Sequence, residues 1–408
     1  MLLEYLNTTD NRMKSKCLTY FLLLFCLGGF GQKTTPKAVN PYASIDKKAL
    51  QIPDSLTKTT DGIASYINST FSNENDKARA IFIWVATNIQ YDYENMFAIN
   101  FYEKKEEKIS KPLKTRKGIC ENYAYLFNDI CLKSGIKSFV IEGYTKQNGF
   151  TDYIPHAWCS ARIDSTYFIF DPTWGSGGVI NGKFVKQINN YYFKALPSSI
   201  IKSHMPFDYL WQFLNYPITN QEFYDGKVQQ NKSKPFFNYL DSIKEYEKLS
   251  KIEQLIASAG RTERNGVKNS MIFDRLAHIK MEIAHYNQER TVNSYNSAVS
   301  EYNDGINLLN DFIQYRNKQF NPAKTDKELQ EMVDSPYLKL SEAKSKLNEI
   351  KGDTANVTMS LTSINKSIDD AIIHVNEQKD FVKQYLSKGK LGRKTMFTKY
   401  TWFGIPLN

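Results

Sequence analysis

The stretch from Arg116 to Ala124 reads RKGICENYA, and it decides what is expected of the first half of the chain. Cys120 stands where a helix should begin, behind a glycine and several cationic side chains. A helix N-terminus and nearby positive charge both favour the nucleophilic thiolate over the thiol. Taken alone, such a cysteine is more often a small buried apolar side chain. The stretch therefore needs partners elsewhere before it indicates chemistry.

Apolar residues at helical spacing occur on both sides of this cysteine and predict helices there. The expected helices are 61–70, 76–91 with Asp76 as its N-cap, and 119–134 closed by Gly135. Residues 94–117 are rich in Lys and Glu, and we expect an exposed loop there.

Strand-like runs follow the cysteine helix. They cover 138–143, 157–163 and 167–170, with turn signals at 147–149 and 164–165. Helices followed by strands are typical of an α+β fold. We therefore predict a helix-borne cysteine packed on an antiparallel sheet.

His156 and Asp171 flank the hairpin of the last two strands. His156 opens one strand and Asp171 closes the next, so a tight turn between them brings both to one end of the sheet. Each residue alone has an ordinary structural interpretation. Together with Cys120 they fit the roles of nucleophile, base and orienting carboxylate.

The segments 116–124, 156–158 (HAW) and 171–174 (DPTW) together resemble the transglutaminase-like superfamily. Residues 77–84 and 88–92 are similar to its preceding helix, and Gly143-Tyr144 to the strand end that follows the nucleophile helix. Segments 204–206 (HMP) and 211–214, with Pro217 and 222–223, resemble its kyphoscoliosis-peptidase-like branch. The resemblance covers roughly residues 60–226.

The resemblance implies a papain-like site in which Cys120 attacks a carbonyl, His156 moves the proton and Asp171 holds His156. It implies a thioester intermediate and an oxyanion held by the Cys120 backbone N–H and one side chain. The side-chain candidates are Trp158, Trp174 and Tyr144. Crosslinking transglutaminases usually carry Gln-Cys-Trp, whereas this chain has Ile119-Cys120-Glu121, which favours hydrolysis over crosslinking.

The second half of the chain changes character near residue 227. Apolar residues at helical spacing predict one long helix, or two nearly continuous ones, over roughly 272–313, with a phase slip at 287–294. Asn321-Pro322 should end this helix, and a capping box at 325–328 should start the next one. Ser335-Pro336 should interrupt that helix and begin a new helical segment. Gly352 should end that segment, and a last stripe of apolar residues at helical spacing covers 357–375. These stripes predict an all-α helical bundle or antiparallel coiled coil.

The N-terminus has the layout of a signal peptide, with a short basic stretch at 13–16 and an apolar run at 18–30. We therefore expect an exported protein that is periplasmic, cell-surface or secreted. No later run reaches the ~18 apolar residues of a membrane span. The expected domains are a signal peptide (1–31), a leader (32–59), the transglutaminase-like domain (60–226), a linker (227–235), the helical region (236–390) and a basic aromatic tail (391–408).

Composition limits the remaining possibilities. With 53 basic and 43 acidic residues the net charge is +10, but more of the excess lies in the helical half, and nucleic-acid binding is not expected. Five Cys are too few for a disulfide scaffold. Cys120, Cys131, Cys159 and His156 lack the close paired spacing of a zinc site. No metal or cofactor is expected.

Three functions remain open from the residues. The first is a cysteine peptidase or amidase that acts on a protein or peptide, the second is acyl transfer to an amine, and the third is a non-catalytic peptide-binding or scaffold module. The helical region could bind a protein partner or self-associate. The tail either contacts an anionic surface or folds its aromatic side chains onto the helices, and we favour the latter.

Overall fold

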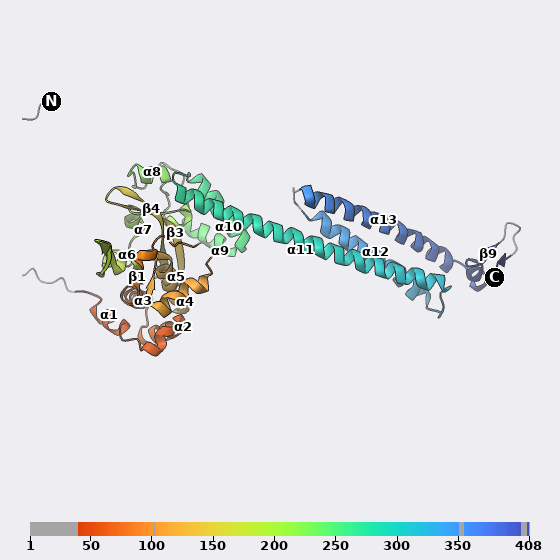
Figure 1. The fold of residues 1–408 in the computed structure, drawn as a ribbon, viewed down its shortest axis with the longest axis horizontal. Helices are drawn as coiled ribbons and strands as arrows, with labels where there is room; N and C mark the ends of the chain where they lie inside the picture. The colour runs from red at the N-terminus through yellow and green to blue at the C-terminus, as the bar shows by residue number, and fades with distance from the viewer. Residues whose placement is uncertain (1–39, 101–102, 351–354, 401–405, 408) are drawn as a thin grey trace, which may run out of the picture.

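The computed structural model describes residues 40–100, 103–350, 355–400 and 406–407, so the expected signal peptide and residues 32–39 of the leader lie outside it. Figure 1 shows a globular domain and a long helical projection joined by one helix, α11 (Ser270–Asn317). Among the described residues, no helix combines the length and the apolar character needed to cross a bilayer.

An antiparallel sheet with the strand order β5-β4-β3-β8 forms the centre of the globular domain, as expected for an α+β fold. The strands are β3 (Ser138–Gln147), β4 (Phe150–Ile163), β5 (Thr166–Phe170) and β8 (His204–Pro206). Both expected turns are confirmed, because residues 148–149 and 164–165 have positive φ angles. Two consecutive positive φ angles are typical of tight hairpins whose twist matches the flanking strands.

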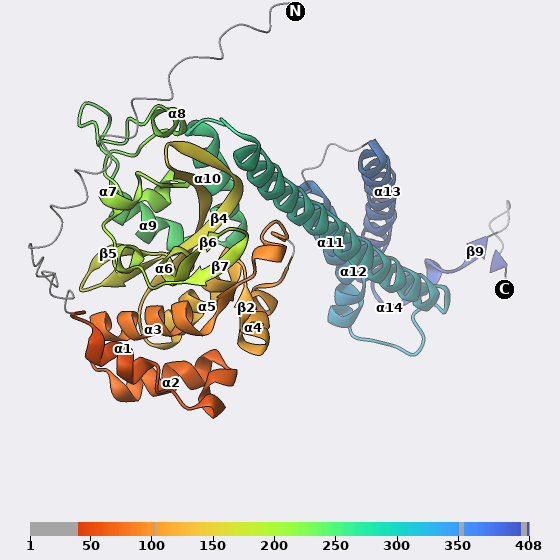
Figure 2. The ribbon, with the colours of Figure 1, turned by 60° about the vertical axis from the view of Figure 1, so that its left-hand side comes forward.

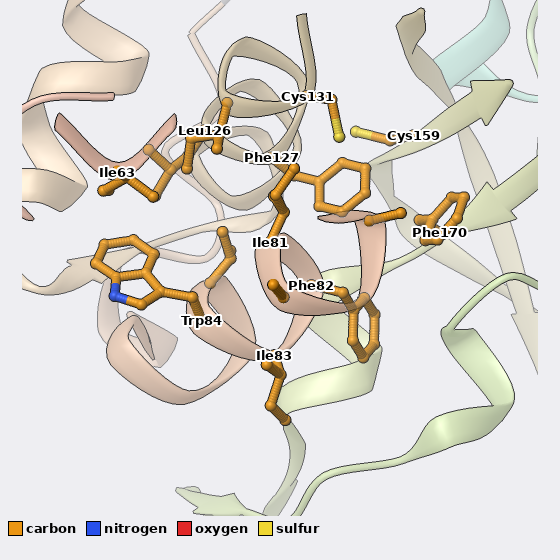
Figure 3. Close-up of a cluster of buried hydrophobic side chains, with 14 of the residues drawn as sticks. Ile63, Ile81, Phe82, Ile83, Trp84, Leu126, Phe127, Cys131, Cys159 and Phe170 are labelled. Carbon is orange, nitrogen blue, oxygen red and sulfur yellow. The ribbon is translucent and has the colours of Figure 1, made fainter. Parts of the chain in front are cut away.

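One face of the sheet packs against α3 (Glu74–Asn88) and α5 (Cys120–Lys133), and α2 (Thr60–Thr70) packs against these two helices. Together with the sheet the three helices bury a shared apolar core. Figure 3 shows part of this core, in which Phe127 of α5 stacks on Phe170 of β5 with ring centroids 5.2 Å apart. The core holds α5 against the sheet, and the end of α5 at Cys120 is thereby fixed relative to β4 and β5.

The opposite face of the sheet is covered by segments from the second half of the chain. Trp158 and Ile141 share a buried cluster with Ile243 of α9 (Tyr239–Lys248), and Tyr144 shares another with Met271 of α11. Arg261 of α10 (Lys251–Arg264) forms an ion pair with the buried Asp208 of the globular domain, with Arg261 Nε 2.7 Å from Asp208 Oδ1. The globular unit therefore extends past the linker expected at 227–235, to the start of α11.

Beyond the globular domain, α11 is joined by α12 (Asp326–Asn348) and α13 (Ala355–Leu386). We call this part of the molecule, with the C-terminal half of α11, the helical arm; Figure 2 shows it projecting from the domain. The three helices bury a common apolar stripe. Residues 284–290 of α11, between the domain and the arm, are exposed all round.

The arm agrees with the sequence in part. One continuous α11 and the capping box of Thr325 and Glu328 are confirmed. The expected restart at Ser335-Pro336 is wrong, because α12 runs through Pro336, which is buried in the arm. Packing outweighs the one backbone hydrogen bond that proline cannot make. Gly352, the expected stop, lies outside the described residues.

The C-terminal tail folds onto the arm where it is described. Phe397 packs in a cluster with Phe320, Phe381 and Tyr385. Arg393 of α14 (Lys390–Thr395) forms a bidentate ion pair with Asp326, and both N···O distances are 2.7 Å.

The expected exposed loop over 94–117 is wrong, since α4 (Lys105–Thr115) occupies nearly half of it. Its residue Lys108 is buried and bonds Glu121 of α5, Nζ to Oε1, at 2.9 Å. The many Lys and Glu residues suggested exposure, but a helix can bury one charged residue when a partner neutralises it. The helix therefore packs directly beside the first turn of α5.

Two further expectations at the N-terminal end are corrected. Asn73 caps α3, because its side chain accepts from Asp76 N at 2.8 Å, so Asp76 is not the N-cap. Part of the leader is structured as α1 (Ala43–Ala49) and a 3₁₀ turn, η1 (Asp54–Lys58). Asp46 of α1 pairs with the buried Arg79 of α3 at 2.6 and 2.8 Å, which ties the leader to the domain.

The remaining elements are short. They are β1 (Gln90–Tyr91), η2 (Tyr93–Asn95), β2 (Lys117–Gly118), α6 (Pro172–Ser176), β6 (Gly177–Ile180), β7 (Lys183–Lys186), η3 (Asn190–Tyr192), α7 (Pro197–Ile200), η4 (Tyr209–Gln212), α8 (Asn220–Tyr224), β9 (Lys399–Tyr400) and β10 (Pro406–Leu407).

Candidate active site

Cys120 is the first residue of α5 and lines a cleft of about 660 Å³. The entry to the helix is held by Asn122, whose side chain accepts from Ile119 N at 2.9 Å and donates to Lys108 O at 3.0 Å. Gly118 is required here, because a Cβ at this position would lie 2.6 Å from the Asn122 Cβ. The backbone N–H groups of the first helical turn lack intrahelical partners, so they are free to bind negative charge near the Cys120 sulfur.

His156 lies on β4 and lines the same cleft. Its Nε2 atom is 2.9 Å from Asp171 Oδ2, which leaves Nδ1 as the ring nitrogen for Cys120. The Cys120 side chain lies next to this ring: it contributes to the raised pKa of His156, and its Sγ atom donates to the carbonyl oxygen of the preceding residue, Pro155, at 4.0 Å. The structure therefore brings together the three residues that the sequence singled out, in the order thiol, imidazole, carboxylate.

Asp171 caps the short helix α6 and is fully buried. Its Oδ1 atom accepts from the backbone N–H groups of Thr173 and Trp174, at 2.9 and 3.1 Å. Its Oδ2 atom receives two imidazoles, from His156 at 2.9 Å and from His204 at 3.1 Å. Burial raises the pKa of Asp171, but the charge and hydrogen bonds of the two histidines outweigh it and hold this pKa far below its usual range. Asp171 is thus an ionised acceptor with four donors.

His204 is a member of the site that the sequence argument did not select. It lies on β8, fully buried, and its ring stands edge-on to Trp174 with centroids 4.6 Å apart. Its segment carried part of the family resemblance, but no local pattern tied it to the hairpin of His156 and Asp171. Pairing of β8 with β3 brings it there.

The two histidines differ in charge. Burial lowers the pKa of His156, but the Asp171 carboxylate and Cys120 outweigh it and raise this pKa to about 10. Burial also lowers the pKa of His204, and its bond to Asp171 does not compensate. At neutral pH we therefore assign a charged His156 and a neutral His204.

This assignment can be measured by ¹⁵N NMR of histidine-labelled protein. We expect His156 to be protonated at pH 7 and to lose its proton as the pH rises through about 10, and His204 to be neutral at pH 7. In Cys120→Ser the midpoint of His156 should fall, because the contribution of the thiol is lost. A His156 midpoint near 6.5 in the unmodified protein would contradict the assignment.

The three candidate oxyanion residues are placed differently. Trp174 lines the cleft. Trp158 is buried in the apolar cluster on the sheet face opposite α5. Tyr144 lies in another apolar cluster, where its hydroxyl donates to Asn220 Oδ1 at 2.8 Å. Tyr91, which the sequence argument did not select for this role, also lines the cleft. Burial, and to a smaller extent the charge of Cys120, raises the pKa of Tyr91, so its hydroxyl stays a donor.

Cys131 and Cys159 are free thiols inside the core, where Figure 3 shows their sulfur atoms facing one another. Burial raises the pKa of both. Cys159 Sγ also donates to Ala124 O at 3.1 Å. Buried thiols with raised pKa values are poor nucleophiles, so these two residues serve as internal controls for Cys120.

His156, Asp171 and His204 form a cluster whose ligand-type atoms lie within 4.8 Å of one another. Both Nε2 atoms already bond the same carboxylate oxygen, and the other oxygen binds two backbone N–H groups. Each group is satisfied by hydrogen bonds. We therefore interpret the cluster as a hydrogen-bonded chain.

Comparison with known proteins identifies the globular domain. Residues 58–197 match a family model described as a transglutaminase-like domain, which confirms the resemblance and the fold class. Kyphoscoliosis peptidase of Homo sapiens is 31% identical over 174 residues, covering 40% of this chain and 25% of the relative. The Mus musculus protein of that name is 27% identical over 217 residues, covering 50% and 31%. The chain thus spans less than a third of the length of either relative.

A comparison of solved structures found the crystal structure of a candidate cysteine protease from Cytophaga hutchinsonii. It is 24% identical, covers 33% of this chain and 41% of that chain, and has a TM-score of 0.24.

Proposed function

Because residues 58–197 match the model of the transglutaminase-like domain, we propose that the chain is an exported cysteine peptidase or amidase that acts on a protein or peptide. The observation that carries this proposal is that Cys120 and His156 line one cleft and that His156 is hydrogen-bonded to the buried Asp171. The mouse and human relatives are both named as peptidases, which supports the same reaction class.

In the proposed reaction, the Cys120 sulfur attacks the carbonyl carbon of the substrate amide while His156 holds the proton of the thiol. The negative oxygen of the tetrahedral intermediate is stabilised by the Cys120 backbone N–H and by the Tyr91 hydroxyl or the Trp174 side chain. The C–N bond breaks as His156 gives its proton to the leaving amine, which leaves a thioester on Cys120. Water then attacks the thioester with His156 as base, and the acid product and the thiol are released.

The lining of the cleft supports a polypeptide substrate. Its aromatic members are Tyr91, Tyr93, Tyr153, Trp174, Phe184 and Tyr192. Lys146 is bound to two backbone carbonyls and Asp152 to neighbouring polar side chains, so neither charge is free for a ligand. Tyr153 of this lining is 78% exposed, and Phe150 on the same strand is 80% exposed. Such a surface suits an extended peptide with large apolar side chains beside the reacting bond.

Hydrolysis is proposed over crosslinking for a reason at the nucleophile itself. Glu121, which follows Cys120, is turned away into a buried pair with Lys108, at the position where crosslinking enzymes usually carry Trp. Acyl transfer would be shown by incorporation of a labelled amine into an acceptor protein, and hydrolysis by release of the free acid alone.

The reactivity of Cys120 tests the proposal. Iodoacetamide at pH 7 should label Cys120 faster than it labels free cysteine, and Cys131 and Cys159 should remain unlabelled in the folded protein. In His156→Ala the rate should fall roughly tenfold or more, because the imidazolium that stabilises the thiolate is gone. Mass spectrometry of peptides gives the rate for each thiol. Labelling of Cys120 no faster than free cysteine would reject a catalytic role.

Export is proposed from the basic and apolar segments at residues 13–30. Its test is the N-terminal sequence of the protein recovered after expression in its own host. A mature chain that begins near residue 32 would support export, and an intact N-terminus in the cytoplasmic fraction would refute it.

A further inference from the structure

Asp171 carries a second imidazole, and this feature has no part in the reaction just described. His204 Nε2 lies 3.1 Å from Asp171 Oδ2, the same oxygen atom that holds His156. His204 itself is fully buried and does not reach the substrate. On its other side, Nδ1 is 2.8 Å from the Ser203 hydroxyl.

The surroundings of His204 determine which ring nitrogen carries the proton. A carboxylate oxygen only accepts, so Nε2 must donate to Asp171. In a neutral ring Nδ1 is then an acceptor, and the Ser203 hydroxyl is the donor that satisfies it. Trp158 and Trp174 stand edge-on to the ring, with centroids 5.1 and 4.6 Å away, and prevent it from turning. One tautomer and one orientation are thereby selected.

A fixed donor at this position has a definite effect on Asp171. The backbone N–H groups of Thr173 and Trp174 hold Oδ1, but Oδ2 has only the two imidazoles. Without His204, Oδ2 would have a single donor in a site closed to water, and the carboxylate could rotate about its bond to Cβ. A buried acceptor that loses a donor loses both stability and orientation.

We propose that His204 is a positioning residue of the candidate active site, a neutral imidazole that fixes the Asp171 carboxylate and thereby the ring of His156. The hydrogen-bonded chain then runs Ser203, His204, Asp171, His156 and ends beside Cys120; Ser203 and Cys120 both line the cleft. This role rests on the proposed function only for its effect on reactivity, because the hydrogen bond between His156 and Asp171 can be observed without any reaction.

Two substitutions separate positioning from packing. His204→Leu removes the donor and fills most of the space, whereas His204→Gln keeps an amide N–H that can reach Asp171 from the same side. We expect iodoacetamide labelling of Cys120 to slow roughly tenfold or more in His204→Leu and to stay within about threefold of the unmodified rate in His204→Gln. His278→Leu, at another buried histidine outside the cleft, is the matched control and should leave the labelling rate unchanged.

A spectroscopic measurement accompanies the rates. The Nε2 proton of His156, bonded to Asp171, should give a protected downfield ¹H NMR signal in the unmodified protein and in His204→Gln. The signal should be lost or broadened in His204→Leu. Ser203→Ala removes the donor to Nδ1 and a longer contact of the same hydroxyl with Ile200 O at 3.3 Å. It should weaken the signal less and serves as a second variant if His204→Leu does not fold.

The outcomes are distinguishable. Equal labelling rates and equal His156 signals in the unmodified protein, His204→Leu and Ser203→Ala would overturn the positioning role. If Cys120 is unreactive in every variant but the His156 signal depends on His204, the positioning role stands and the proposed function fails. A loss of thermal stability alone, with rate and signal unchanged, would assign His204 to packing and reject the proposal.

Discussion

Asp171→Asn should make Cys120 roughly 10²-fold less reactive toward iodoacetamide at pH 6. The backbone N–H groups of Thr173 and Trp174 hold the atom at the Oδ1 position, so that atom must remain an oxygen. The amide nitrogen of the asparagine is thereby placed at the Oδ2 position, where it donates to His156 Nε2. His156 must then keep its proton on Nδ1 as a neutral ring, which cannot take the proton of Cys120.

The direction of this effect follows from the charge of His156. The Asp171 carboxylate makes the largest contribution that raises the pKa of His156, so its loss lowers this pKa and favours the neutral ring. The ratio of the alkylation rates of the variant and the unmodified protein at pH 6 measures the effect.

A matched control for this variant is Asp129→Asn on α5, which changes the charge identically at a pair with Lys133 outside the cleft. It should leave the labelling rate unchanged. An Asp171→Asn protein that is folded and labels as fast as the unmodified protein at pH 6 would show that the carboxylate does not organise the site.

Lys108→Met should lower the free energy of unfolding by about 3–5 kcal/mol. The Lys108 and Glu121 side chains are only 4% and 5% exposed, with Nζ and Oε1 2.9 Å apart. Burial raises the pKa of Glu121, and Lys108 offsets part of this rise. When Lys108 is removed, Glu121 must either remain charged without a partner or take up a proton, and both cost free energy.

The double variant Lys108→Met with Glu121→Leu should recover most of this loss, because two apolar side chains of similar volume replace the pair. Denaturant unfolding followed by tryptophan fluorescence gives both values. As a control, Lys248→Met removes a partner from an exposed pair with Glu245 and should change stability by less than about 1 kcal/mol. A Lys108→Met protein within 1 kcal/mol of the unmodified chain would contradict the argument.

The sequence predicted the parts of the fold that local patterns encode. Apolar spacing located α3, α5 and α11, and paired turn residues located both hairpins, because side-chain period and backbone conformation act within a few residues. The same hairpin logic placed His156 beside Asp171. The start of α5 at Cys120 likewise followed from neighbouring residues.

The expectations that failed depend on contacts between distant segments. Lys108 is charged, and only the position of Glu121 on a neighbouring helix shows that it is buried. Pro336 normally interrupts a helix, but burial in the arm overrides that preference. His204 enters the site through a strand pairing 33 residues away from Asp171 along the chain, a distance over which no periodicity extends. Tyr91 reaches the cleft in a comparable way, through the pairing of β1 with β2.

The exposed residues 284–290 of α11 have a mechanical consequence. A helix of 48 residues is about 72 Å long, and in the part of the chain that the structure describes its residues 284–290 are exposed and are covered by no other segment. Because a continuous helix has a fixed rise per residue, α11 holds the domain and the arm at a fixed distance from each other. Whatever anchors the far end of the arm would determine the radius within which the cleft can meet a substrate.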